Sequence, residues 1–244
     1  MRTLLLAALA LVLLVGRAGI AHAGFFDPCL VPGDGTITVT QNTVVANRRV
    51  TLPADQSQRS CDIEVADGVS LTLVNVTVNV ANDKRLNFSG GDTSSLSIVN
   101  TSVNACDNDI FGFKQVTITN SRLVDPQDGE CDVKEFYVTG NVTISKSLLT
   151  AQPPEADSDI VISSENGSVT LAHDTLIAND DITIQALGGG VTVTRSRLSA
   201  QGNIDISGAG RVEVVGNELQ AAGSNTISGN PCRSLLNRPR VSCS

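Results

Sequence analysis

The chain has 244 residues, a formal net charge of −8, 3% aromatic residues and no tryptophan. An acidic surface of this kind repels nucleic acid and anionic lipid, which disfavours both as partners. With so few aromatic side chains the core must be aliphatic, and the abundance of Val, Ile, Leu and Thr favours strands over helices.

The first 23 residues have the pattern of a secretory signal peptide. Arg2 precedes an apolar run over residues 4–15, and Ala21-His22-Ala23 forms a cleavage site of the small-x-small type. The run is shorter than the ~20 residues of a membrane span, so we expect a secreted protein, periplasmic or extracellular, without stable membrane insertion. Removing Arg2 and Arg17 from the 17 basic residues leaves 15 against 25 acidic residues, a net charge of −10.

Eight segments of the mature chain share the pattern apolar-x-apolar-x-x-x-x-apolar. The segments are ITVTQNTV from Ile37, LTLVNVTV from Leu71, LSIVNTSV from Leu96, VTITNSRL from Val116, VTISKSLL from Val142, VTLAHDTL from Val169, VTVTRSRL from Val191 and VEVVGNEL from Val212. A second alternating run follows each of them, for example DIEV, DIVI and NIDI. Each repeat therefore contains two or three short strands separated by polar corners.

These repeats predict an all-β fold, a parallel β-helix of about eight irregular coils over residues 36–228. One coil cannot bury its inner face alone, so the coils stack and rise by one strand spacing, ~4.8 Å, per turn. A β-sandwich also has short strands at similar intervals, but it does not predict one motif that recurs eight times. Residues 24–35 and 229–244 are expected to cap the two ends, because terminal coils expose strand edges.

The polar corners and aliphatic columns resemble those of a known family. Asn75, Asn100 and Asn120 occupy the same corner in successive repeats, where they are expected to form an amide ladder. Together with the coil length, these features resemble the right-handed parallel β-helix of the pectin-lyase-like superfamily, over about residues 36–228. The resemblance implies right-handed coils.

The same resemblance implies an enzyme alternative, a lyase, epimerase or hydrolase of acidic polysaccharide that combines calcium-binding carboxylates with an arginine base. No catalytic motif of that superfamily is matched here. Arg122, Arg195 and Arg197 lie at corners without an evident acidic partner, and fold analogy alone does not establish an activity. We therefore expect a non-catalytic protein and assign no catalytic residue.

The six cysteines of the mature chain favour disulfides in an oxidising compartment. Cys106 and Cys131 open corresponding strands of adjacent coils, where the Cα separation would be near the ~5.5 Å that a disulfide requires. Cys61 lacks such a neighbour, so its expected partner is Cys29 in the N-terminal cap. The remaining pair is Cys232 and Cys243.

Two groups of side chains are candidate binding sites. Calcium needs six to eight oxygen ligands, and the best acidic cluster is Asp157, Asp159, Asp180 and Asp181. The alternative is that these carboxylates cap the N–H groups of the following strands. Calcium is therefore a possible ligand and no cofactor is firmly expected.

The second candidate is a site for glycan. In DIFG and EFYV the outward residues are Phe111 and Tyr137, one coil apart, and exposed aromatic rings stack on sugar rings. Neighbouring Lys114 and Lys134 are expected to add contacts to an acidic sugar. The alternative is that a loop packs over both rings.

A column of hydroxyl side chains on the first strand supports one more interpretation. Positions such as Thr117, Thr143 and Thr192 form a Thr-x-Thr array that resembles the ice-binding face of repeat antifreeze proteins, although Thr is also a common solvent-facing strand residue. We thus expect a secreted, non-catalytic binding or structural protein with extracellular or surface polysaccharide as partner. The alternatives are the enzyme acting on acidic polysaccharide and an ice-binding protein.

Overall fold

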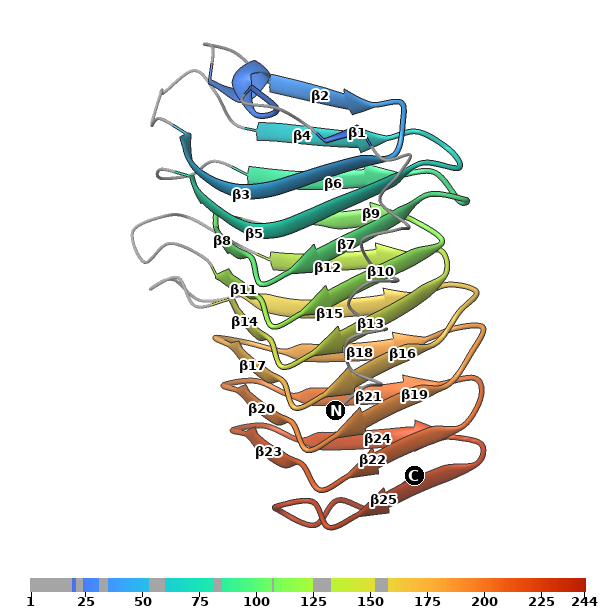
Figure 1. The fold of residues 1–244 in the computed structure, drawn as a ribbon. Coiled ribbons are helices and arrows are strands. Elements are labelled where there is room, and N and C mark those ends of the chain that lie inside the picture. Colours follow the sequence, from blue (N-terminus) through green and yellow to red (C-terminus); the bar gives the residue numbers. More distant parts are fainter. Residues whose placement is uncertain are drawn as a thin grey trace, which may run out of the picture.

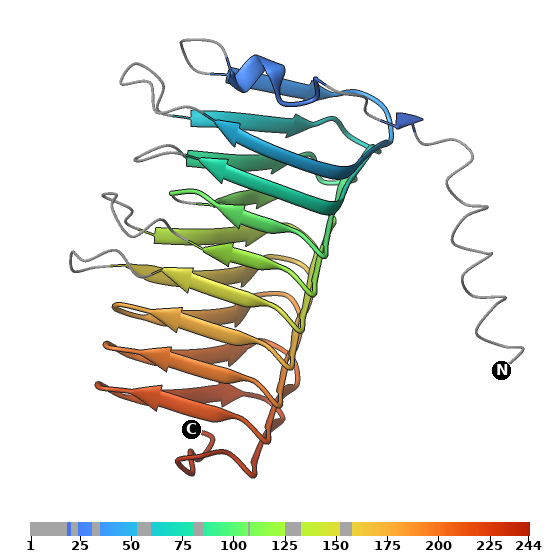
Figure 2. The same ribbon diagram turned by 60° about the vertical axis from the view of Figure 1, so that its left-hand side comes forward.

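The protein is an all-β parallel β-solenoid of about seven turns, which confirms the predicted fold class. The structure is a computed structural model, and it describes residues 19–20, 24–30, 35–52, 60–80, 85–106, 108–124, 133–151 and 158–244. The coils stack in chain order from blue to red (Figure 1), and the side view shows them as a single column (Figure 2). Helix within the described residues is limited to the 3-10 turn η2 (Asp27–Cys29).

One wall of the solenoid, here called the third face, is a parallel sheet of nine strands. The sheet contains the alternating runs that follow each repeat motif. Its strands are β2 (Gly35–Val39), β4 (Ser60–Val65), β6 (Arg85–Gly90), β9 (Ile110–Gly112), β12 (Val133–Val138), β15 (Asp159–Ser164), β18 (Ile182–Ala186), β21 (Ile204–Gly208) and β24 (Asn225–Gly229).

The other two walls belong to one bent sheet. The first face consists of β7 (Ser95–Val99), β10 (Gln115–Thr119), β13 (Asn141–Ser145), β16 (Val169–Ala172), β19 (Val191–Thr194), β22 (Val212–Val215) and β25 (Cys232–Leu235). The second face consists of β8 (Ser102–Asn104), β11 (Arg122–Val124), β14 (Leu148–Ala151), β17 (Thr175–Ala178), β20 (Arg197–Ala200) and β23 (Glu218–Ala221). The long strands β3 (Thr43–Leu52) and β5 (Ser70–Val80) run through both faces, and β1 (Gly19–Ile20) pairs with β3.

The core is a set of aliphatic columns, as the alternation predicts. The first apolar position of the motif is buried in seven successive coils and pairs in register from β5 to β22. Its members are Leu71, Leu96, Val116, Val142, Val169, Val191 and Val212. Each inner residue contacts the same position one coil away, so the stacked coils bury a continuous core.

The first of the eight predicted rows is wrong in register. Ile37 lies in β2 and pairs with Ile63 on the third face, whereas the strand equivalent to Leu71 begins at Thr43 in β3. The motif matched at Ile37 because two alternating strands follow each other there with similar spacing. A further row, which the repeat motif does not match, lies in β25, where Cys232 pairs with Val212.

The corner between the first and second faces is made by one residue with a positive φ. The expected amide ladder is present there only in part: Asn120 Nδ2 donates to Asn100 Oδ1 at 2.7 Å, whereas Asn75 Nδ2 donates to Asn47 Oδ1 at 3.1 Å, in the preceding coil, and is not joined to Asn100. The φ angles of these four residues lie between 49° and 55°. Asn tolerates this left-handed conformation better than most residues, which explains its use at the corner.

The residue after this corner points inward and forms a second, buried ladder. In each coil its side-chain oxygen accepts the backbone N–H of the equivalent residue in the preceding coil, at 2.7–3.3 Å. The accepting residues are Thr101, Ser121, Ser147, Asp174, Ser196, Asn217 and Asn237. A bend in the wall thereby keeps its backbone donors satisfied without water.

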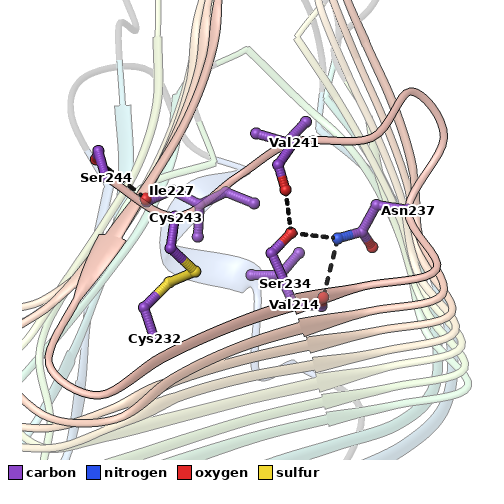
Figure 3. The surroundings of a disulfide bond; sticks show 8 residues. All are labelled: Val214, Ile227, Cys232, Ser234, Asn237, Val241, Cys243 and Ser244. Atoms are coloured by element: carbon purple, nitrogen blue, oxygen red, sulfur yellow. Dashed lines mark hydrogen bonds between the residues drawn. A yellow bond between two sulfur atoms is a disulfide. The ribbon is translucent and has the colours of Figure 1, made fainter.

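Disulfides close both ends. Cys29 in η2 bonds to Cys61 in β4 with a Cα–Cα distance of 5.4 Å, and Cys232 bonds to Cys243 at 6.0 Å, as predicted. Figure 3 shows the second bond holding the C-terminal tail under the last coil, where Ser234 Oγ donates to Val241 O. Cys106 is also disulfide-bonded, and its expected partner, Cys131, lies outside the described residues.

The disulfides indicate an oxidising, non-cytoplasmic location. Among the described residues, no helix has the length and apolar character needed to cross a membrane. The expected signal peptide, residues 1–23, lies almost wholly outside the described part of the chain.

Candidate functional site

An outward pair of aromatic rings on the third face is the best-formed surface feature among the predicted sites. Tyr137 in β12 pairs in register with Phe111 in β9, and their ring centroids are 6.2 Å apart with an interplanar angle of 12°. Tyr137 is 42% exposed and Phe111 is half-buried. The two residues, here called the aromatic patch, therefore present one continuous apolar surface to solvent.

The placement of the aromatic patch follows from alternation on β9 and β12. Ile110 and Phe136 point inward and are fully buried, which turns the next residue of each strand outward. Most other phenylalanines lie inside: Phe26, Phe88, Phe113 and Phe136 are buried and Phe25 is partly buried. The single tyrosine and one of the six phenylalanines therefore occupy adjacent outward positions.

A tight corner after β9 fixes one end of the patch. Gly112 has a φ of 74°, and a Cβ there would lie 1.9 Å from Gly90 O. The backbones of the two adjacent coils can therefore approach this closely only because residue 112 is a glycine. Phe113, fully buried, fills the space beside Gly90, where a Cβ would lie 2.3 Å from its ring. The packing of Gly112 and Phe113 against Gly90 therefore restricts the backbone position of β9.

The patch is bordered by carboxylates. Glu135 lies on the same outward side of β12, and its N–H donates to Asp109 Oδ1 at 3.1 Å in the preceding coil. Burial, and then the charge of Glu135, raise the pKa of Tyr137 above its usual value. A phenol is protonated at neutral pH even with its ordinary pKa, so the Tyr137 hydroxyl is available as a hydrogen-bond donor.

The two predicted lysines do not both join the patch. Lys114 is exposed at the corner that follows β9. Lys134 is fully buried, because it lies two residues before the inward Phe136 and shares its side of the strand. The expected contact of Lys134 with an acidic sugar is therefore wrong, and the charge that acts on the Tyr137 ring is that of Glu135.

In the predicted calcium cluster, two carboxylates accept hydrogen bonds from backbone N–H groups. Asp159 Oδ1 accepts the N–H of Asp181 at 2.8 Å, and Asp181 Oδ1 in turn accepts the N–H of Asn203. These carboxylates bond to the backbone of the next coil, as the alternative interpretation stated. Among the described residues no group of three or more His, Cys, Asp or Glu is placed to hold a metal ion; Asp157 lies outside them, and Asp180 is partly exposed in the loop before β18.

Two side chains beside the aromatic patch were not part of the predicted glycan site, although the alternation of inward and outward residues along the strands would have identified them. Glu135 and Asp109 occupy outward positions beside the rings, and counting by two from Tyr137 and Phe111 finds both. The same count identifies Lys134 as inward. Register between coils, which decides that Asp109 faces Glu135, depends on loop lengths.

No family model, no curated protein and no solved structure matches this chain. The resemblance noted from the sequence is thus shown at the level of architecture, a parallel β-solenoid.

Proposed function

We propose that this protein is a secreted, non-catalytic β-solenoid that binds polysaccharide through the aromatic patch. The observation that carries the proposal is the near-parallel, outward pair Phe111 and Tyr137 in a chain that otherwise keeps its aromatic rings inside. Exposed apolar surface costs free energy in water, and rimmed by polar groups it is typical of binding sites. Sugar rings present apolar C–H faces that stack on such rings.

The carboxylates beside the patch favour a neutral glycan. Glu135 can accept hydrogen bonds from sugar hydroxyls, and its charge, which acts on Tyr137, would repel a uronic acid at the same place. The protonated Tyr137 hydroxyl adds a donor. We therefore expect neutral hexose or N-acetylhexosamine chains to bind here in preference to acidic ones.

We also propose that the solenoid is of the right-handed, pectin-lyase-like type. The single-residue corner with its Asn ladder supports this assignment. The superfamily's enzymes act on acidic polysaccharide, and this is the alternative function. The acidic border of the aromatic patch weighs against such a substrate on the third face.

Binding can be measured by titrating neutral oligosaccharides, such as cellohexaose, laminarihexaose and chitohexaose, into the mature protein by calorimetry. The variant Phe111→Ala/Tyr137→Ala should weaken binding roughly tenfold or more, since each stacking contact contributes on the order of 1 kcal/mol. Tyr137→Phe retains the ring and isolates the hydroxyl. Leu187→Ala is the matched control, because Leu187 is a 60% exposed apolar side chain outside the patch.

A double variant that folds normally and keeps full affinity would eliminate the patch as the site. Absence of binding to every neutral glycan would eliminate the proposed function. An assay for unsaturated sugar products, run with polygalacturonate, tests the enzyme alternative, and turnover there would favour a lyase.

Ice binding is a second candidate, favoured by the register of the first face. Six hydroxyl residues occupy one outward position in adjacent coils that pair in register at the ~4.8 Å strand spacing: Thr72, Ser97, Thr117, Thr143, Thr170 and Thr192. Glu213 ends the column. Thermal hysteresis that Thr143→Asp abolishes would support this function, and its absence in the wild type would contradict it.

A further inference from the structure

The last corner between the first and second faces carries a leucine where all earlier corners carry a polar residue or glycine. The earlier corner residues all have positive φ angles: Asn47, Asn75, Asn100, Asn120, Lys146, His173, Arg195 and Gly216. Leu236 continues this column in the last coil with a φ of 57°. Large apolar residues are rare in the left-handed conformation, so backbone preference does not explain this leucine.

Leu236 is also the most exposed large apolar side chain of the described residues. It is 82% exposed, and the adjacent Leu235 is 44% exposed. The segment after β25 lies at the end of the column of coils (Figures 1 and 2). The two leucines, here called the apolar tip, therefore present hydrophobic surface at one end of the solenoid, and covering them would be favourable in water.

The residues that flank the tip hold its backbone in place. Asn237 is 4% exposed, and its Nδ2 donates to Val214 O and to Ser234 Oγ, both at 2.9 Å (Figure 3). The disulfide between Cys232 and Cys243 closes the segment that contains both leucines. The tip is thus a built feature of the last coil and not a frayed strand end.

The charged residues around the tip are basic. Arg233, Arg238 and Arg240 flank the two leucines in the sequence, and no Asp or Glu follows Glu218. Arg233 pairs with Glu213 at 2.9 Å. Arg238 and Arg240 are exposed and form no ion pair with another described residue. This end of an acidic protein is therefore locally positive.

A second copy of the chain is a poor partner for the tip. Contact between two tips would bring the arginines of both copies together. The opposite end of the solenoid exposes Arg48 and Arg49 beside the apolar Leu30, so head-to-tail stacking would also bring like charges together. Like charges at a contact oppose association, and the partner that fits is therefore anionic.

An anionic bilayer fits the tip better than an anionic protein does. A stable protein interface buries about 800 Å² on each partner, which is far more than two leucines and their neighbouring arginines supply. A bilayer sets no such minimum, because single apolar side chains enter its interface and each nearby basic residue adds its own attraction.

The acidic character of the whole chain does not prevent this approach. Charges in solution are screened beyond ~8 Å at physiological ionic strength. The lateral faces of the solenoid carry the acidic residues, whereas the last coil carries three arginines and no carboxylate side chain. A bilayer that meets the end of the column therefore meets the positive tip first.

We propose that the apolar tip, Leu235 and Leu236 with Arg238 and Arg240, docks the end of the solenoid reversibly on an anionic lipid surface. The leucines would enter the interface and the arginines would contact lipid phosphates. The site is separate from the aromatic patch on the third face, so the proposal goes beyond the proposed function: a docked solenoid would hold its glycan-binding face away from the membrane.

Co-sedimentation of the mature protein with vesicles measures docking. Vesicles of phosphatidylcholine with about one-third phosphatidylglycerol should pellet the protein, and pure phosphatidylcholine should not. Leu236→Asn should weaken the partitioning about tenfold, and it is expected to fold because Asn occupies this corner in four earlier coils. Leu187→Asn is the matched control, since Leu187 is 60% exposed elsewhere, and it should change the partitioning less than about twofold.

The charge is tested by a second pair of variants. Arg238→Gln/Arg240→Gln should weaken partitioning about tenfold or more, because each arginine near an anionic surface contributes separately. Arg48→Gln/Arg49→Gln removes the same charge from the opposite end and should leave the partitioning unchanged. Equal weakening by both double variants would overturn the site, because general electrostatics would then explain the binding.

A fluorescent reporter locates the contact. The chain has no tryptophan, so Leu236→Trp places a single indole at the tip, and its emission should shift to the blue when anionic vesicles are added. Leu187→Trp should show no shift. An unshifted Leu236→Trp spectrum, or full binding by Leu236→Asn, would overturn the proposal.

Other occupants of the tip give different results. Self-association of the wild type that Leu236→Asn abolishes would show that a second copy covers the tip, and it would overturn the assignment to lipid. Equal binding to both kinds of vesicle would contradict the role of the arginines. The Phe111→Ala/Tyr137→Ala variant should bind anionic vesicles normally, so failure of the tip and failure of the aromatic patch are distinguishable.

Discussion

Asp174 is the charged member of the buried ladder, and its replacement by Asn should stabilise the protein at neutral pH. The side chain is 2% exposed, and its Oδ1 and Oδ2 accept the N–H groups of Ser147 and Ala172, both at 2.8 Å. Burial raises the pKa of Asp174 from 3.8 to about 6, although these two hydrogen bonds oppose the shift. The folded state thus binds this proton more tightly than the unfolded state does.

The sign of the pH effect follows from that difference. A raised carboxyl pKa means that unfolding releases the proton between about pH 4 and 6, so the contribution of Asp174 to stability falls as pH rises through this window. Two pKa units correspond to about 3 kcal/mol. Above pH 6 the whole penalty is present, and below pH 4 it is absent.

Asn fits the same place, because Asn217 and Asn237 occupy it in later coils and donate through Nδ2 to Val193 O and Val214 O. The variant Asp174→Asn loses the bond from Ala172, which costs about 1 kcal/mol. We therefore expect a net gain of about 2 kcal/mol at pH 7.5 and no gain at pH 3.5.

Urea unfolding of both proteins between pH 3.5 and 8 measures this difference. Asp174→Ser, which matches Ser147 and Ser196 in the adjacent coils, is the control for loss of charge without an amide. A stability difference that is independent of pH, or a variant less stable than the wild type at pH 7.5, would refute the reasoning.

Three further changes test the fold. Ile144→Asp buries an unpaired charge and should lower the free energy of unfolding by more than about 4 kcal/mol, whereas Thr143→Asp, outward on the same strand, should lower it by less than about 1 kcal/mol. Equal losses of stability in chemical denaturation would contradict the assignment of inner and outer faces. Cys243→Ser opens the C-terminal link of separation 11 and should cost roughly 3 kcal/mol by loop entropy, measured by thermal unfolding; an unchanged melting temperature would show that the link adds no stability. Gly112→Ala should destabilise the protein strongly, since its Cβ would lie 1.9 Å from Gly90 O. Gly216→Asn should be tolerated, because a Cβ there meets only Arg195 Cγ, at 3.8 Å. Similar melting temperatures for the two variants would be inconsistent with this geometry.

The sequence by itself determined the coil and its inner and outer sides. Alternation is a local property: a residue two positions from a buried Phe136 shares its side of the strand, which settles Tyr137 as outward and Lys134 as inward. The recurring Val-x-Ile and Leu-x-Leu pairs required stacked coils, because a single coil has no other surface against which to bury them.

Only the tertiary structure decided which residues meet across coils. Loops of different length separate the strands, so the sequence places Arg122, Lys146 and His173 more than 20 residues apart, while stacking brings them into one groove. The register of the first coil also required the tertiary structure, since Ile37 fits the repeat motif but pairs on the third face, whereas the position equivalent to Leu71 is Thr43, which the motif does not match. Side-chain direction is fixed by the neighbouring residues of the chain, but contact between coils depends on the paths of all the intervening loops.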